Sequence, residues 1–182
     1  MNLVLIGFMG VGKTSVGKGL ARRLEWSFID TDSLIEEAYC LSVATIFAKH
    51  GEASFRETEK RVVESVAGWR RCVIATGGGV VLDRGNVDHL KSQGLLIHLT
   101  LSPETIFHRI GAQRKRPLLE TENPQRTLEN LFRSRERLYR TYSDFTINRN
   151  DLSVDKTVEK VLALVAFHGI DGGQGDQQVE RK

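Results

Sequence analysis

Cysteine is scarce in this sequence of 182 residues, which has only Cys40 and Cys72, far apart along the chain. This excludes a disulfide framework, and the two residues lack the spacing of a metal site. Cys72 lies in an apolar run, which indicates a core residue rather than a reactive thiol. Long hydrophobic runs are also missing, so we expect no membrane-spanning segment. Residues 1–9 have no basic region of the kind that begins a secretory signal. We therefore expect a cytoplasmic protein.

A concentrated charge of one sign is missing as well. The net charge is only +3, with 40% apolar and 27% charged residues, values ordinary for one soluble globular domain. This balance suits small anionic ligands but provides no basic stripe for binding a nucleic acid. Arg133, Arg135, Arg137 and Arg140 do cluster. A solvated helix face is one interpretation for three of these four arginines.

The most informative motif lies at residues 7–14, GFMGVGKT, which fits the phosphate-loop pattern G-x-x-x-x-G-K-[ST]. The apolar run LVLI before it predicts a buried strand, and residues 15–24 after it predict a helix with one apolar face. Such a loop directs backbone N–H groups and the positive end of a helix dipole at phosphates. We expect Lys13 to reach the β- and γ-phosphates and the Thr14 hydroxyl to bind Mg²⁺. The alternative is a glycine-rich turn without a ligand.

Strand and helix patterns alternate along the chain, which predicts an α/β fold with a parallel sheet. Strands are expected at residues 2–6, 26–30, 71–76, 95–99 and 144–147. Helices are expected at residues 13–24, 33–40, 43–50, 54–65, 86–92, 103–110, 124–142 and 154–168. Residues 111–123 read as a mobile loop. Residues 1–168 are predicted to form one domain, and the Gly- and Gln-rich residues 169–182 a disordered tail.

Several classes of phosphate-loop protein are disfavoured by the sequence. The D-x-x-G and N-K-x-D motifs of GTPases are missing, and the strands ending near Thr76 and Leu99 carry no acid of the kind that motor ATPases use. Asp30 and Asp32 instead follow the second strand, whose carboxyl end lies beside the phosphate loop in an open parallel sheet. This arrangement favours a small phosphotransferase.

Each of these two acids has a specific predicted role. Asp30 is a candidate for binding Mg²⁺, through water, because Mg²⁺ gives up its waters reluctantly. Asp32 is the candidate for orienting an acceptor hydroxyl, or for acting as its base, during attack on the γ-phosphate. The alternative for either is a cap on the helix expected near Ser33.

Three further segments are candidates for ligand contact. Arg56 lies near a helix start, where the dipole disfavours a cation, so it needs an anionic ligand or a nearby acid such as Glu59. The glycine run at residues 77–79 indicates either a close approach to a ligand or a tight turn. The charged loop carries Arg116, which could close onto the transferring phosphoryl group. Its neighbours Arg114 and Lys115 are expected to be solvated.

Taken together, these segments resemble the shikimate kinases over residues 2–167. Five blocks agree in order and spacing, at residues 7–14 (GFMGVGKT), 28–32 (FIDTD), 51–59 (GEASFRETE), 75–79 (ATGGG) and 116–119 (RPLL). Arg135 followed by Leu138 and Tyr139 forms a sixth. The phosphate loop alone would be ambiguous, whereas the combination is specific.

The resemblance implies MgATP-dependent phosphorylation of the shikimate 3-hydroxyl, on the route to chorismate and the aromatic amino acids. It implies a three-layer α/β/α P-loop kinase fold with a central parallel five-stranded sheet. A substrate-binding subdomain near residues 33–61 and a lid near residues 111–123 are implied with it. ATP and shikimate are the expected partners, with Mg²⁺ but neither nucleic acid nor membrane, and we expect a monomer.

The resemblance also implies roles for individual residues. It implies that shikimate is bound by Asp32, Arg56, Gly78 and Arg135, and Mg²⁺ by Thr14. Together with the reading of the residues themselves, we expect Lys13, Asp32 and Arg116 to be catalytic, and Asp30 to bind Mg²⁺ beside Thr14. ATP is bound by Gly10, Val11, Gly12, Lys13, Thr14, Ser15, Arg109 and Arg116, with Arg109 along the adenine.

The sequence departs from the family pattern at three places. Cys40 and Leu41 stand where the family usually has Thr-Gly, and residues 140–144 are less typical than the block before them. Residues 148–152 match poorly, so the resemblance assigns no adenine contacts there. Two alternatives stay open. One is a kinase for another hydroxy acid such as gluconate, and the other is a non-catalytic nucleotide-binding module. The presence together of five candidate residues argues against the module: Lys13, Thr14, Asp30, Asp32 and Arg116.

Overall fold

The centre of the molecule is a five-stranded parallel sheet in the order β2-β3-β1-β4-β5. The computed structural model describes residues 1–111, 117–119 and 121–167. The strands are β1 (Asn2–Ile6), β2 (Ser27–Asp30), β3 (Cys72–Ala75), β4 (Gly94–Thr100) and β5 (Phe145–Asn148). All five residues of β1 are buried, as expected for a strand covered on both faces. The predicted parallel sheet and α/β fold are confirmed.

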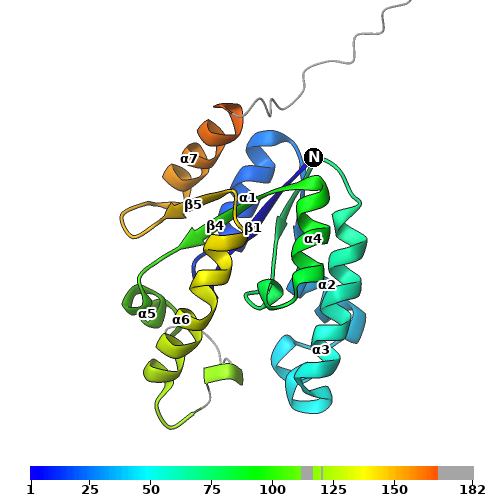
Figure 1. Ribbon diagram of the computed structural model, residues 1–182, viewed down its shortest axis with the longest axis vertical. Coiled ribbons are helices and arrows are strands. Elements are labelled where there is room, and N and C mark those ends of the chain that lie inside the picture. Colours follow the sequence, from blue (N-terminus) through cyan, green and yellow to red (C-terminus); the bar gives the residue numbers. More distant parts are fainter. Residues whose placement is uncertain (112–116, 120, 168–182) are drawn as a thin grey trace, which may run out of the picture.

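Helices cover both faces of this sheet, which gives three layers (Figure 1). α1 packs with α7, and α4 packs with α3, so the sheet lies between two helical layers. Residues 124–142 form a helix with the bounds that the sequence predicts. The helices are α1 (Lys13–Leu24), α2 (Thr31–Tyr39), α3 (Val43–Ala67), α4 (Arg84–Gln93), α5 (Pro103–Gly111), α6 (Pro124–Tyr142) and α7 (Val154–Phe167).

The structure refines the predicted bounds of several helices. α4 begins at Arg84 rather than residue 86, because the Asp83 side chain accepts hydrogen bonds from the backbone N–H groups of Gly85 and Asn86. α2 begins at Thr31 rather than Ser33, because the Asp30 side chain accepts a hydrogen bond from the Asp32 N–H at 3.2 Å and caps the helix there. The two helices expected at residues 43–50 and 54–65 are confirmed as the two halves of α3. Gly51, with φ 76° and ψ 169°, has a non-helical backbone and separates them, and the second half extends to Ala67.

Two short 3-10 helices were not predicted. η1 (Val80–Leu82) follows the glycine run, and η2 (Pro117–Leu119) lies within the segment expected to be a loop. Both are single turns of three residues, too short to carry the apolar periodicity that reveals a helix in a sequence. Arg114, Lys115 and Arg116, together with residues 169–182, lie outside the described residues.

The apolar core has two parts. The larger one fills the space around the sheet and includes Cys72, which is buried as predicted. A smaller cluster of Ile35, Ile46 and Phe55 joins α2 to α3. Each of these three side chains is at most 3% exposed. At about 1.5–3 kcal/mol for each buried side chain, the cluster holds the α2–α3 segment together at one end of the sheet.

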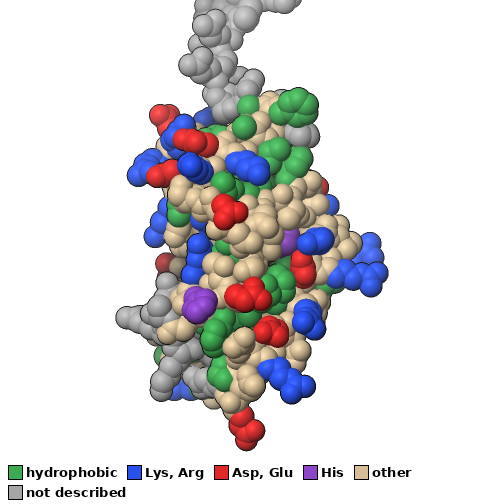
Figure 2. Space-filling model, turned by 90° about the vertical axis from the view of Figure 1, so that its left-hand side faces the viewer, with side chains coloured by type: hydrophobic (Ala, Val, Ile, Leu, Met, Phe, Trp, Pro, Cys, Tyr) green, Lys and Arg blue, Asp and Glu red, His purple; other side chains and the backbone are tan. Residues whose placement is uncertain are grey.

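The surface carries both signs of charge. Basic and acidic side chains are interspersed over the face shown in Figure 2. Within the described residues, no helix combines the length and the apolar character that crossing a membrane requires.

Candidate active site

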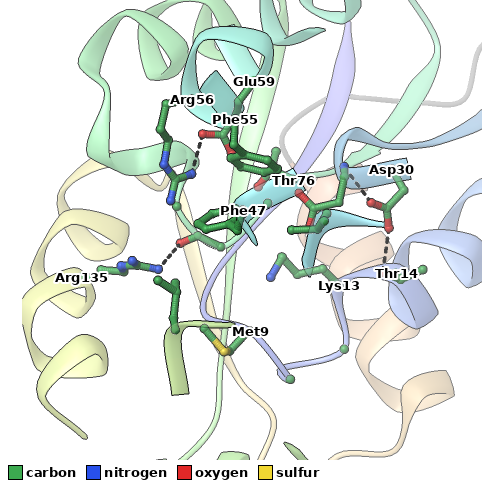
Figure 3. A pocket seen from close by; sticks show the side chains of 18 of the residues that line it. Met9, Lys13, Thr14, Asp30, Phe47, Phe55, Arg56, Glu59, Thr76 and Arg135 are labelled. Carbon is green, nitrogen blue, oxygen red and sulfur yellow. Dashed lines mark hydrogen bonds and ion pairs between the residues drawn. The ribbon is translucent and has the colours of Figure 1, made fainter. Parts of the chain in front are cut away.

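A cavity of about 580 Å³ lies at the carboxyl ends of the strands, where ligands bind in open α/β sheets. Its walls come from segments far apart in the sequence: the phosphate loop, the end of β2, the α3 helix, the glycine run after β3, and helices α5 and α6 (Figure 3). The predicted site residues that line it are Gly10, Gly12, Lys13, Thr14, Ser15, Asp30, Asp32, Arg56, Gly78, Arg109 and Arg135.

The phosphate loop connects β1 to α1, as its motif predicts. The Lys13 ammonium group donates to the carbonyl oxygens of Gly7, at 2.8 Å, and of Phe8, at 2.9 Å. These bonds fold the lysine side chain over the loop that it belongs to. Val11 is fully buried and is not among the residues that line the cavity, so its contact with ATP stays a prediction. Arg116, the remaining predicted ATP contact, lies outside the described residues.

Thr14 and Asp30 form a pair of oxygen ligands beside the loop. The Thr14 hydroxyl donates to Asp30 Oδ2 at 2.8 Å (Figure 3). Mg²⁺ prefers such hard oxygen ligands and usually takes one or two from protein, with water and phosphate oxygens completing the octahedron. The described residues contain no group of three or more acids, histidines or cysteines that could hold a metal alone. The Thr14–Asp30 pair therefore fits a metal ion that is bound together with phosphates.

Asp32 lies in the first turn of α2 and lines the cavity. An acidic side chain is favourable there, at the positive end of the helix dipole. Because Asp30 is the residue that caps α2, capping does not account for the Asp32 carboxylate. A side chain at Gly77 would collide with it, since a Cβ atom there would lie 2.6 Å from Asp32 Oδ1. The first residue of the glycine run is therefore needed to make room for this carboxylate.

Arg56 is held by two acids of its own helix while it faces the cavity. It contacts Glu59 at 2.7 Å and Glu52 at 3.0 Å. Burial alone would lower the pKa of Arg56, but the two carboxylates outweigh it and the net shift is upward. Burial raises the pKa of Glu59, whose side chain is 1% exposed, and the Arg56 charge opposes that rise. The internal ion pairs, one of the two alternatives for Arg56, are therefore present. Contact with a ligand stays a prediction, which its place in the cavity wall supports.

Arg135 lines the cavity together with Arg56, and both side chains are labelled in Figure 3. Its guanidinium donates to the Gly78 carbonyl at 3.5 Å, a long and weak bond. Arg135 is 5% exposed, whereas Arg133, Arg137 and Arg140 of the same helix are exposed. The solvated-face interpretation therefore holds for three of the four arginines, and the fourth belongs to the cavity.

Tyr139 is a site residue whose role the sequence did not reveal. Its hydroxyl donates to the Gly78 carbonyl, and its ring stacks on His98 with a centroid separation of 5.1 Å. Burial raises the pKa of Tyr139, so the hydroxyl stays protonated and remains a donor. This bond holds the Gly78–Gly79 peptide in one orientation. The sequence does place Tyr139 four residues after Arg135, and residues four apart share a helix face. This spacing could have indicated that Tyr139 lies on the same side of the helix as Arg135.

The apolar part of the wall comes from aromatic rings. Phe47 and Phe55 line the cavity with their ring centroids 4.8 Å apart. The cavity thus has a phosphate-binding end at the loop, and a second compartment where two arginines, one aspartate and two aromatic rings converge. A small anion with hydroxyl groups suits this second compartment.

The family model for shikimate kinase matches residues 9–166. The chain belongs to the shikimate kinase family. A shikimate kinase from Caldanaerobacter subterraneus subsp. tengcongensis is 45% identical over 161 residues, which cover 88% of this chain and 94% of that protein. One from Moorella thermoacetica is 49% identical over 147 residues, covering 81% and 84%.

Solved structures agree with this membership in the shikimate kinase family. The shikimate kinase from Acinetobacter baumannii, determined in complex with shikimate, has a TM-score of 0.89 at 35% identity and covers 93% of this chain and 95% of its own. A gluconokinase from Sinorhizobium meliloti has a TM-score of 0.57 at 16% identity, with 92% of each chain covered, and that likeness is one of fold alone.

Proposed function

We propose that this protein is a shikimate kinase that transfers the γ-phosphoryl group of ATP to the shikimate 3-hydroxyl, giving shikimate 3-phosphate and ADP. One observation carries the proposal: Asp32, Arg56 and Arg135 line the same cavity as the phosphate loop. The reaction belongs to chorismate and aromatic amino acid biosynthesis.

The nucleotide end is formed by the phosphate loop. We expect the backbone N–H groups of this loop to bind the phosphates of ATP; the residues are Gly10, Val11, Gly12, Lys13, Thr14 and Ser15. On nucleotide binding, the Lys13 ammonium exchanges its loop carbonyl partners for phosphate oxygens. Thr14 and Asp30 hold Mg²⁺, Asp30 through water. Bound Mg²⁺ neutralises charge that develops on the phosphate oxygens. Arg109 also lines the cavity, and we assign it to the adenine base.

The acceptor end recognises a carboxylate and hydroxyl groups. Arg56 and Arg135 grip the shikimate carboxylate through charge-assisted hydrogen bonds, each stronger than a bond between neutral groups. The Gly78 backbone and Asp32 bind hydroxyls. Glu59 fixes the direction of the Arg56 guanidinium by its ion pair, while Tyr139 and Arg135 fix the Gly78 carbonyl.

Asp32 acts on the hydroxyl that attacks. Its carboxylate accepts a hydrogen bond from the 3-hydroxyl, orients its oxygen toward the γ-phosphorus and takes the proton as the new O–P bond forms. Lys13 stabilises the charge that spreads over the γ-phosphoryl oxygens, while the ADP oxygen leaves on the opposite side. Most of the rate acceleration therefore comes from positioning the reacting groups and from electrostatic stabilisation of the transition state.

Further parts of the proposal concern the whole enzyme. Residues 33–61 serve as the substrate-binding subdomain, and residues 111–123 as a lid that brings Arg116 to the phosphates. The separate apolar cluster of Ile35, Ile46 and Phe55 supports the first of these. The lid includes residues outside the described part of the chain. We also propose that the enzyme is a cytoplasmic monomer that acts without nucleic acid or membrane.

The test is ADP release with MgATP and a panel of acceptors: shikimate, gluconate, AMP and none. Strong turnover with shikimate alone supports the proposal. Turnover with gluconate or AMP in its place would support a kinase activity but would contradict shikimate as the acceptor. ADP binding without turnover on any acceptor would favour a non-catalytic nucleotide-binding module.

A further inference from the structure

Arg149 is one of the largest fully buried side chains in the described residues, at 2% exposed. It follows β5 at the carboxyl edge of the sheet, in the segment that matches the family pattern poorly. An arginine carries a permanent charge, and a buried charge is costly unless something compensates it. The buried charge of Arg149 therefore requires compensation from neighbouring groups or from a ligand.

The guanidinium of Arg149 is anchored on both sides. Its Nε donates to Thr157 Oγ1 of α7 at 3.0 Å, and its Nη1 donates to the carbonyl oxygen of Val11 in the phosphate loop. Thr157 is itself held by a bond from its hydroxyl to the Ser153 carbonyl at 2.7 Å. The arginine thus links the start of α7 to the loop that cradles the phosphates.

The bond to Val11 fixes the direction of the next backbone N–H. In a trans peptide the C=O and N–H groups point in opposite directions, so a Val11 carbonyl turned toward Arg149 turns the Gly12 N–H away from it. Gly12 lines the cavity, with φ 89°, and a Cβ atom there would lie 3.5 Å from the Arg149 Cζ atom and closer to its Nη1. Arg149 therefore lies directly behind the loop, opposite the side that receives phosphates.

The charge of Arg149 has no anion beside it in the described part of the chain. Burial lowers the pKa of Arg149, and the positive charge of Arg109 lowers it further. The two cations therefore repel each other, and Arg109 lines the cavity. An acid here would neutralise them but would also repel a polyphosphate. A bound polyphosphate supplies the compensating charge itself, at short range and away from bulk water.

We propose that Arg149 is a positioning residue for the nucleotide phosphates: it holds the Val11–Gly12 peptide in the phosphate-binding orientation and places a fixed positive charge behind the loop. The inference rests on the proposed function, because it assumes that the loop binds ATP. In this role Arg149 makes no contact with the acceptor. Loss of the side chain weakens nucleotide binding and leaves shikimate binding unchanged.

The experiment compares Arg149→Met and Arg149→Lys with the unaltered protein, and uses the exposed Arg133→Met as a matched control. Calorimetric titrations measure the dissociation constants of ADP and of shikimate separately, and steady-state kinetics give KM for ATP and kcat. For Arg149→Met we expect ADP binding at least fivefold weaker, shikimate binding within twofold, and a rise in KM for ATP larger than the fall in kcat.

Arg149→Lys keeps the charge but cannot bridge Val11 and Thr157, so it is expected to bind ADP at least threefold more weakly. It also provides the test if the methionine variant does not fold. ADP affinity within twofold of the unaltered protein would overturn the proposal, as would equal losses of ADP and shikimate affinity, which indicate general damage. A failure of the unaltered protein to bind ADP would instead count against the proposed function.

Discussion

Asp32 is the residue on which the transfer step depends. Replacing it with asparagine keeps the size and removes the charge that accepts the proton. We expect Asp32→Asn to lower kcat by about 10²–10⁴-fold, the usual contribution of general acid–base catalysis, with ADP affinity within twofold. Turnover and ADP titration of the same preparation measure both.

Asp88→Asn is the matched control, because Asp88 is an exposed acid on α4. It should leave both quantities unchanged. Near-normal turnover of Asp32→Asn would show that this acid has no part in transfer, and the acceptor would then need a different base.

The two arginines of the acceptor compartment give a second test at the residue scale. Arg56→Ala and Arg135→Ala should each weaken shikimate binding by about 1.5–3 kcal/mol, the value of a charge-assisted hydrogen bond. Calorimetry with shikimate measures this, with the exposed Arg137→Ala as control. Unchanged affinity in both variants would refute the assignment of the carboxylate site.

Arg56→Ala should also destabilise the fold, since it leaves the buried Glu59 without its cation. Adding Glu59→Gln removes that stranded charge. The double variant should recover part of the lost unfolding free energy in urea titrations but none of the shikimate affinity. Recovery of affinity would mean that Arg56 acts only as the partner of Glu59.

At the scale of elements, the end of α2 carries a strained residue. Cys40 caps this helix with φ 52° and ψ 30°, a left-handed conformation that glycine adopts without the steric cost of a Cβ atom. Cys40→Gly should therefore raise the unfolding free energy by about 0.5–1 kcal/mol. Urea unfolding measures this, and Cys40→Ala, which keeps the Cβ atom, should show no such gain. A loss of stability in Cys40→Gly would contradict the account.

Most elements could be predicted from the sequence because their signals are local. Apolar runs mark β1 and β3, and the phosphate-loop motif marks the start of α1. The early start of α2 was missed because Asp30 was assigned only to the end of a strand. In the structure Asp30 is both the last residue of β2 and the N-cap of α2. Single-turn elements such as η1 leave no periodic pattern to detect.

The site was less predictable, because several of its contacts join residues distant in sequence. Lys13, Asp32 and Arg56 stand in recognisable motifs, and the structure places them around one cavity. Tyr139 reaches Gly78 only because α6 packs beside η1, and Arg149 reaches Val11 only through the position of β5. No local spacing reports such tertiary contacts.

At the scale of the whole molecule, the buried His98 makes the stability of the fold depend on pH. It is 1% exposed, and burial, with the charges of Arg140 and Lys13, lowers the pKa of His98 from 6.5 to about 4. Above pH 6.5 the imidazole is neutral in both the folded and the unfolded chain, so the free energy of unfolding is not lowered by His98. Below pH 6.5 the unfolded chain takes up a proton that the folded chain refuses until about pH 4. Stability is therefore lost as the pH falls between these values, by up to about 3 kcal/mol.

Urea unfolding at pH 7 and pH 4.5 measures this loss. The His98→Gln variant does not titrate in this range, and its stability should fall less between the two pH values than that of the unaltered protein. Equal losses in both proteins would show that His98 is not the source of the acid sensitivity.

The position of the phosphate in the product tests the central claim most directly. The protein is incubated with MgATP and shikimate, and the product is examined by phosphorus–proton correlation NMR. The account predicts one phosphate ester, coupled to the proton on carbon 3, in amounts equal to the ADP formed. An ester at another hydroxyl, or ADP without any shikimate ester, would contradict it.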